Sequence, residues 1–308
     1  MRTEEIRYDS RDGKTRLYAV RFIPDGEVKA VLQLIHGMAE HIGRYAHVAE
    51  WFTQRGILVT GEDHLGHGRS VPEGGTKGYF CEQDPATVAV RDVHRLKKMT
   101  QEAYPGVPYF ILGHSMGSLI LRNYLYRYGT GIKGAVICGT ASQAPVMVKT
   151  GLMIANLQSV FTKEKGKHKA YFLNSLAFGD PKKKEPGHIN DWLCTDPDVV
   201  KKYDEDPECG YLFTVNGFKT LLTIVDRNND KKNVEKIPKD LPIMIISGKE
   251  DSVGDFGKGV TKVFEEYKDL GIENVECKLY DGLRHEILNE GAKEEVYKDI
   301  YDWMMKNM

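Results

Sequence analysis

Apolar runs and polar interruptions divide the chain into alternating strands and helices. Short apolar runs, typical of strands buried on both faces, occupy residues 29–35, 57–60, 107–112, 134–140 and 241–248, and residues 275–280 predict a last strand. Apolar residues with helical spacing occupy residues 45–55, 86–103, 260–270 and 294–305. Because strands and helices alternate, the pattern predicts an α/β fold with a mostly parallel sheet.

Two segments depart from this regular alternation. Residues 4–23 predict two antiparallel strands, because Thr15–Ile23 alternates apolar and polar positions and Asp12-Gly13 is a hairpin turn signal. Residues 143–229 have apolar side chains among Pro, Gly and charged runs, a pattern that favours short packed helices. We therefore predict core residues 1–142 and 230–308, separated by a helical cap at residues 143–229. Most apolar side chains of the cap are expected to form its own small core, and the others to line an acyl-chain pocket.

The sequence Gly113-His114-Ser115-Met116-Gly117 follows a buried strand and precedes a helical pattern. It matches G-x-S-x-G, the nucleophile elbow, in which a serine lies on a strained turn between strand and helix. Small flanking residues let the backbone pass closely on both sides. We predict that Ser115 is a catalytic nucleophile.

A serine hydroxyl is a weak nucleophile at neutral pH, so Ser115 needs a general base. In folds with this elbow the base follows the serine in the chain. Of the histidines after Ser115, His168 and His188 belong to the predicted cap, whereas His285 follows a core strand. We predict that His285 is the base.

The base needs an acid that orients it, and that acid is expected after the strand that precedes the strand of the histidine. Asp251 occupies this place, three residues past Gly248. Glu250, Asp255 and Asp281 remain alternatives, although each is less well placed on the loop or too close in sequence to the base. An oxyanion hole is expected from the backbone N–H groups of two residues, Met38 and Met116.

Four ordered motifs extend the pattern over nearly the whole chain. They are His36-Gly37-Met38-Ala39-Glu40-His41-Ile42-Gly43-Arg44-Tyr45, Asp63-His64-Leu65-Gly66-His67-Gly68-Arg69-Ser70, Gly113-His114-Ser115-Met116-Gly117 and Arg284-His285-Glu286-Ile287-Leu288-Asn289-Glu290. Together they resemble the monoacylglycerol lipase and lysophospholipase branch of the α/β-hydrolases, which includes serine aminopeptidase-like domains. The resemblance implies an α/β-hydrolase fold with an eight-stranded sheet, helices on both faces and a helical cap. It also implies a Ser115, Asp251 and His285 triad with the Met38 and Met116 amides as oxyanion hole.

Two regions depart from the resemblance. Residues 161–169 of the cap match no motif of that branch, and substrate choice is decided in the cap. Asp251 is followed by Ser252-Val253-Gly254, without the proline that many relatives carry, which leaves the local geometry of the acid loop open.

The composition of the chain also excludes several classes of function. A formal net charge of -1 gives no basic footprint for nucleic acid. The five cysteines are scattered without a C-x-x-C pair, which is typical of reduced thiols in a cytoplasmic protein. No apolar leader and no run approaching about 18 apolar residues occurs, so neither a signal peptide nor a membrane span is expected.

Metal and anion sites are also not expected. His36, His41, His64 and His67 have no carboxylate cluster at ligand spacing, so no metal is predicted, and the chemistry requires no cofactor. The cap contains basic residues that could attract a phosphate headgroup or an anionic membrane surface: Lys163, Lys165, Lys167, Lys169 and Lys182-Lys183-Lys184. Acidic residues of the same segment balance them, which favours a solvated face.

The prediction is a serine hydrolase that cleaves carboxylic esters through an acyl-enzyme. Monoacylglycerols are the favoured substrates, before lysophospholipids and short-chain or hydroxycinnamoyl esters. Aminoacyl amides would indicate a peptidase instead. The alternative of another class is a non-catalytic small-molecule binding protein on the same fold. The elbow serine disfavours dehalogenase and epoxide hydrolase chemistry, which uses a carboxylate at that position.

Overall fold

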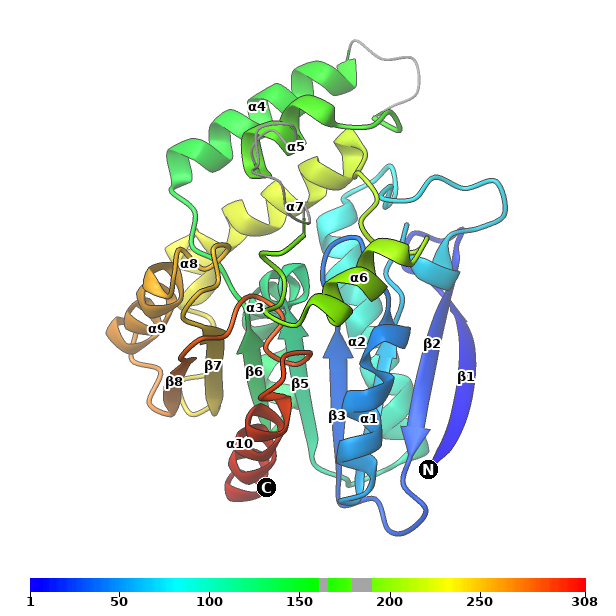
Figure 1. Cartoon of the computed structure of the whole chain (residues 1–308), viewed down its shortest axis with the longest axis vertical. Helices are drawn as coiled ribbons and strands as arrows, with labels where there is room; N and C mark the ends of the chain where they lie inside the picture. The colour runs from blue at the N-terminus through cyan, green and yellow to red at the C-terminus, as the bar shows by residue number, and fades with distance from the viewer. Residues whose placement is uncertain (161–165, 179–189) are drawn as a thin grey trace.

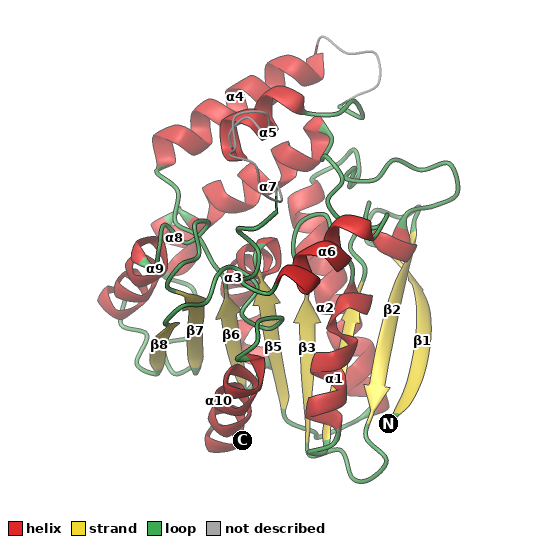
Figure 2. Ribbon diagram, viewed as in Figure 1, coloured by secondary structure: helices red, strands yellow, loops and turns green. Residues whose placement is uncertain are grey.

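A single eight-stranded sheet forms the centre of the molecule. The computed structural model describes residues 1–160, 166–178 and 190–308. The strands follow the order β1-β2-β4-β3-β5-β6-β7-β8 across the sheet. They are β1 (Arg2–Asp9), β2 (Arg16–Ile23), β3 (Ala30–Ile35), β4 (Ile57–Glu62), β5 (Tyr109–His114), β6 (Gly134–Cys138), β7 (Ile243–Gly248) and β8 (Val275–Tyr280). The pairs β1–β2 and β2–β4 are antiparallel and all other neighbours are parallel, which confirms the predicted fold class (Figure 2).

Helices cover both faces of the sheet, because buried strand residues alternate between two cores. Along β3, Leu32 and Leu34 belong to the core formed with α1 (Ala46–Thr53) and α10 (Lys293–Lys306). Val31 and Ile35 belong to the other core. That core is formed with α2 (Pro85–Ala103), α3 (Met116–Tyr128) and α9 (Lys258–Asp269).

The chain between β6 and β7, here called the insertion, contains most of the remaining helices. These are α4 (Pro145–Val160), α5 (Tyr171–Phe178), α6 (Pro197–Glu205), α7 (Val215–Asn228) and α8 (Lys231–Val234). Helices α4, α5 and α7 stand beyond the carboxyl ends of the central strands (Figure 1). The sequence places His188, Lys163, Lys165 and Lys182-Lys183-Lys184 in this segment, and these residues lie outside the described ranges.

The apolar residues of the insertion are less buried than the sequence suggests. On α4, Val148, Gly151 and Ala155 are buried on the side that faces α7, where Leu222 fills the space beside Gly151. Large apolar side chains on the rest of α4 and on α5 are exposed: Val146, Met147, Met153, Leu157, Val160, Tyr171, Phe172 and Leu176. Among the described helices, α4 packs mainly on α7, with a smaller contact to α5. In the described part of the chain, no helix is both long enough and apolar enough to cross a bilayer.

Prolines account for small shifts between predicted and observed strand bounds. The predicted strands at 107–112 and 241–248 begin instead at Tyr109 and Ile243. Each of these residues follows a proline, Pro108 or Pro242, which has no N–H to donate to a neighbouring strand. The strand predicted at 57–60 continues to Glu62, because Ala19 of β2 pairs with Glu62.

Candidate active site

Ser115 lies on a strained turn between β5 and α3, with φ 55° and ψ −121°. A non-glycine residue with positive φ persists only where the surrounding structure holds it. The Ser115 N–H donates to the Cys138 carbonyl at 3.0 Å. A Cβ atom at Gly113 would collide with the Gly117 backbone, and one at Gly117 would collide with the Ile35 carbonyl. Both glycines of the motif are therefore required by the close passage of the chain.

His285 and Asp251 lie together at the same edge of the sheet, on the loops that follow β8 and β7. The Asp251 Oδ2 atom lies 2.9 Å from His285 Nδ1 and accepts a hydrogen bond from Ser247 Oγ at 2.9 Å. The Val253 N–H donates to Asp251 Oδ1 at 2.8 Å. Burial opposes ionisation, but the charge and hydrogen bonds of these neighbours outweigh it and lower the pKa of Asp251 below its ordinary value. Asp251 therefore stays a carboxylate beside the imidazole at neutral pH.

The rival acids lie elsewhere. Glu250, Asp255 and Asp281 are exposed, and Asp281 pairs with Lys249 at 2.5 Å. His168, the described rival to His285, is half-buried in the insertion.

The ring of His285 lies close to residues that surround Ser115. It lies 4.9 Å from the ring of His114, the residue before Ser115. Gly139 follows Cys138, whose carbonyl accepts the Ser115 N–H. A Cβ atom added at Gly139 would lie 3.2 Å from His285 Cε1. His285 Nε2 is buried and has no hydrogen-bond partner among the described residues. An oriented imidazole with one free nitrogen is chemically suited to take a proton from a neighbouring hydroxyl.

Met116 and the loop that carries Met38 both lie next to Ser115. Met116 is the first residue of α3, so its N–H has no intrahelical partner. The loop that carries Met38 also lies close, because a Cβ atom at Gly37 would approach Ser115 Cβ to 3.1 Å. Glu40 shapes this loop by accepting the Gly37 N–H at 2.5 Å. The two residues predicted to form the oxyanion hole are therefore both close to Ser115.

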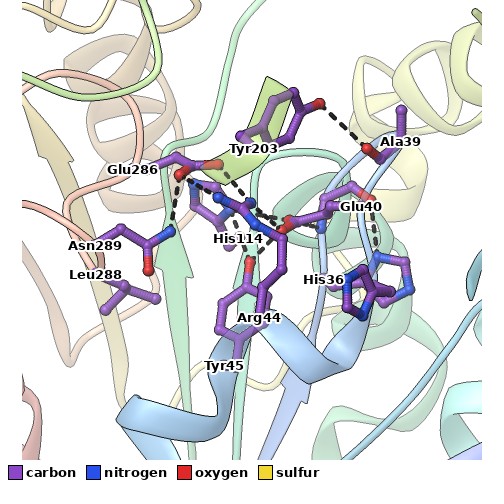
Figure 3. Close-up of polar contacts among 12 residues, drawn as sticks. His36, Ala39, Glu40, Arg44, Tyr45, His114, Tyr203, Glu286, Leu288 and Asn289 are labelled. Carbon is purple, nitrogen blue, oxygen red and sulfur yellow. Dashed lines mark hydrogen bonds and ion pairs between the residues drawn. The ribbon is translucent and has the colours of Figure 1, made fainter. Parts of the chain in front are cut away.

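A buried charge network behind the site was not foreseen. Arg44, on the 3-10 helix Ile42–Tyr45, lies between Glu40 and Glu286, with N···O distances of 2.6 and 2.7 Å (Figure 3). The Tyr45 hydroxyl donates to Glu40 Oε1 at 2.9 Å and lies 3.0 Å from His114 Nδ1. Burial alone would raise the pKa of Glu40, but Arg44 and His114 lower it well below its ordinary value. Glu40, Arg44, Tyr45 and Glu286 all belong to the motifs of the resemblance, which is the one signal in the sequence that could have pointed to them.

Three of the four clustered histidines have structural roles. The rings of His36 and His64 lie 4.2 Å apart, and those of His36 and His67 5.2 Å apart, all buried. His36 Nε2 accepts the His64 N–H at 3.1 Å, and His67 Nδ1 lies 2.9 Å from the Leu65 carbonyl. These contacts brace the loops beside the oxyanion loop.

Comparison with known proteins places this chain in a family. A model of the family described as serine aminopeptidase, S33, matches residues 26–292. The chain belongs to this family. It is 28% identical to the monoacylglycerol lipase of Mycolicibacterium smegmatis over 96% of this chain and 95% of that protein. It is also 28% identical to the human monoglyceride lipase, over 91% of this chain and 84% of that protein.

A solved structure supports the same family assignment. The thermostable carboxyl esterase from Bacillus coagulans, crystallised with glycerol, superposes with a TM-score of 0.91 and 30% identity, over 100% of this chain and 99% of that one. These findings confirm the predicted α/β-hydrolase fold and the predicted class of serine ester hydrolase.

Proposed function

We propose that the protein hydrolyses monoacylglycerols, with Ser115 as nucleophile, His285 as general base and Asp251 as the orienting acid. The observation that carries this proposal is the buried His285 ring. Asp251 holds its Nδ1 at 2.9 Å, its Nε2 has no partner among the described residues, and the ring lies 4.9 Å from the ring of His114, the residue before Ser115. The monoglyceride lipases of human and Mycolicibacterium smegmatis support the substrate class.

The proposed reaction has two acyl-transfer steps. His285 Nε2 takes the Ser115 proton as the serine oxygen attacks the ester carbonyl carbon. The Met38 and Met116 N–H groups stabilise the negative oxygen of the tetrahedral intermediate. The intermediate collapses to an acyl-serine as His285 returns the proton to the departing glycerol oxygen. Water, activated by the same imidazole, then releases the fatty acid and regenerates the serine. Asp251 remains ionised and stabilises the imidazolium.

The insertion is proposed to be a cap of residues 143–229 between core segments 1–142 and 230–308. Its Trp192 ring lies 5.2 Å from the His285 ring, so the cap reaches the catalytic edge. The exposed apolar side chains of α4 and α5 form an unusually apolar surface for a protein in water. We propose that this surface makes transient contact with a lipid aggregate or membrane.

Two of the basic residues singled out in the cap, Lys167 and Lys169, are described, and both contact other parts of the protein. Lys169 Nζ donates to the carbonyls of Lys77 and Leu212, at 3.0 and 2.7 Å. Lys167 Nζ lies 5.5 Å from the centre of the Tyr79 ring. A cytoplasmic location is part of the proposal, and the five free cysteines support it.

The test is hydrolysis of a panel of esters of increasing acyl length by the purified protein, together with a monoacylglycerol, a lysophospholipid, a hydroxycinnamoyl ester and an aminoacyl amide. The Ser115→Ala variant is the blank. The proposal expects serine-dependent turnover with an optimum at medium or long chains and preference for the monoacylglycerol. An optimum at short or aromatic esters would replace lipase by carboxylesterase. Turnover of amides alone would indicate a peptidase, and binding without serine-dependent turnover would indicate a binding protein.

A further inference from the structure

Three potential metal-ligating side chains meet where the insertion contacts the oxyanion loop. His41 lies in the same loop as Met38 and Glu40, just before the 3-10 helix Ile42–Tyr45. Asp206 and Cys209 follow α6 in the insertion. One ligand atom from each of the three lies within 4.8 Å of the others. His41 and Asp206 are 165 residues apart in the chain, so sequence spacing gives no sign of this cluster.

The donor set suits a zinc-class ion. Imidazole nitrogen, carboxylate oxygen and thiolate sulfur are the ligands that Zn²⁺ uses in proteins. His41 Nε2 lies 3.0 Å from Asp206 Oδ2, close to the roughly 3.3 Å that separates two ligands of a tetrahedral zinc ion with bonds of about 2.0 Å. The Cys209 side chain already hydrogen-bonds to Asp206. A small movement of its sulfur toward His41 Nε2 and Asp206 Oδ2 would therefore let all three ligand atoms contact one ion.

Access and charge also allow an ion to bind. The side chains of His41 and Asp206 are 22% and 30% exposed, which leaves an open side for the ion to enter and for water to complete its coordination. Cys209 is buried. The nearby positive charge of Arg44 is paired with Glu40 and Glu286.

The site lies on an established contact between the two parts of the chain. The Gly210 N–H donates to the Ala39 carbonyl at 2.9 Å, and the Tyr203 hydroxyl donates to the same carbonyl at 3.2 Å. Ala39 has φ 53°, so these bonds hold a strained residue one position after Met38.

We propose that His41, Asp206 and Cys209 bind a divalent transition-metal ion of the zinc class, which fastens residues 203–210 of the insertion to the oxyanion loop. The ion takes the place of the thiol proton of Cys209, which is released on binding. The site is separate from the triad, and its existence does not depend on which ester the enzyme cleaves.

The test uses full-length protein freed of metal with a chelator and then titrated with Zn²⁺ against a chelating dye. One equivalent is expected to bind. With Co²⁺ the same site is expected to give a thiolate-to-cobalt charge-transfer band and tetrahedral d–d bands. Cys209→Ser and Asp206→Asn are expected to weaken Zn²⁺ binding by more than about 100-fold, since loss of even an outer-shell partner costs about 10–100-fold. Cys277→Ser, which removes a half-buried thiol on β8, is the matched control and keeps the site.

Hydrogen exchange tests the fastening. Zn²⁺ is expected to slow amide exchange in peptides that cover residues 36–45 and 203–210, in the unaltered protein and in Cys277→Ser but not in Cys209→Ser. The metal site is wrong if Zn²⁺ does not bind, or if Cys209→Ser and Asp206→Asn both bind it as well as the unaltered protein. Binding at the three residues without slower exchange in either peptide would contradict the fastening.

Discussion

Arg44 and Glu286 form a two-point ion pair, with Nη1–Oε1 and Nη2–Oε2 distances of 2.7 and 2.8 Å, across 242 positions of sequence. Glu286 directly follows His285, and Arg44 also binds Glu40, the residue that holds the Gly37 N–H (Figure 3). The pair therefore connects the loop of the proposed general base to the proposed oxyanion loop. Both loops approach Ser115, so the network fixes two sides of the site relative to each other.

Replacing Arg44 with methionine is expected to harm both stability and turnover. The substitution leaves the buried Glu40 and Glu286 facing each other without a cation, and breaking a buried pair this way costs about 3–5 kcal/mol of unfolding free energy. Displacement of the oxyanion loop is expected to lower kcat roughly 10–100-fold with little change in KM. Urea unfolding and steady-state kinetics measure the two effects.

Arg69→Met is the control for this substitution. Arg69 pairs with Glu5 at 2.5 Å on the exposed surface, where ion pairs add little. Its loss is expected to leave kcat unchanged and stability nearly so. Equal effects of the two substitutions would contradict a special role for the buried network.

Asp251→Asn is expected to lower kcat by about 10⁴-fold while KM changes little, because an amide can hold the wrong imidazole tautomer and cannot stabilise the imidazolium. Asp281→Asn removes an exposed carboxylate that pairs with Lys249 and serves as the control. Steady-state hydrolysis of a water-soluble ester measures both. If Asp281→Asn were the more damaging change, the assignment of the acid would move to that loop.

The elements of the catalytic edge were predictable because each is signalled locally. Ser115 and Asp251 each follow an apolar run and His285 follows the last strand pattern, and the carboxyl ends of parallel strands meet at one edge. The partners of Arg44 and of His41 were not predictable from spacing. Their contacts join loops 242 and 165 positions apart, and only the sheet order brings those loops together.

Which side chains of the insertion are buried could not be predicted from the sequence either. Periodicity shows that α4 is apolar, but an apolar helix can be buried in a core or left open to a lipid surface. Which of the two applies depends on how many other elements pack against the helix. Here α7 covers the side with Val148 and Ala155, and Met153 and Leu157 remain exposed.

Charging the open side of α4 tests the lipid contact. Met153→Asp combined with Leu157→Asp removes two exposed apolar side chains, each able to contribute about 1.5–3 kcal/mol when fully buried in lipid. Partitioning onto phosphatidylcholine vesicles is expected to fall more than about tenfold, and so is hydrolysis of monoacylglycerol in those vesicles. Hydrolysis of a water-soluble short-chain ester is expected to persist. Phe256→Asp, an exposed apolar residue before α9, is the control, and an equal loss there would contradict a specific surface.

The protonation of the Asp92 carboxyl is expected to make the unfolding free energy depend on pH. Burial, and then the nearby Glu62, raise the pKa of Asp92 to about 8. In the unfolded chain this carboxyl loses its proton near its ordinary pKa of about 4, while the folded protein keeps it. The unfolding free energy therefore falls as pH rises from about 4 to 8. Asp92→Asn keeps the side chain neutral, so unfolding curves measured across this range are expected to show a smaller decline. A decline as steep as before would contradict the assignment.

The central claim is that Ser115 carries the acyl group, and covalent trapping tests it most directly. The purified protein is treated with a fluorophosphonate, digested, and its labelled peptides are identified by mass spectrometry. The account predicts one label per chain, on the peptide that contains Gly113-His114-Ser115-Met116-Gly117, no label in Ser115→Ala, and much slower labelling in His285→Ala. Ester hydrolysis that continues in Ser115→Ala, or a label that accumulates on a different residue, would contradict it.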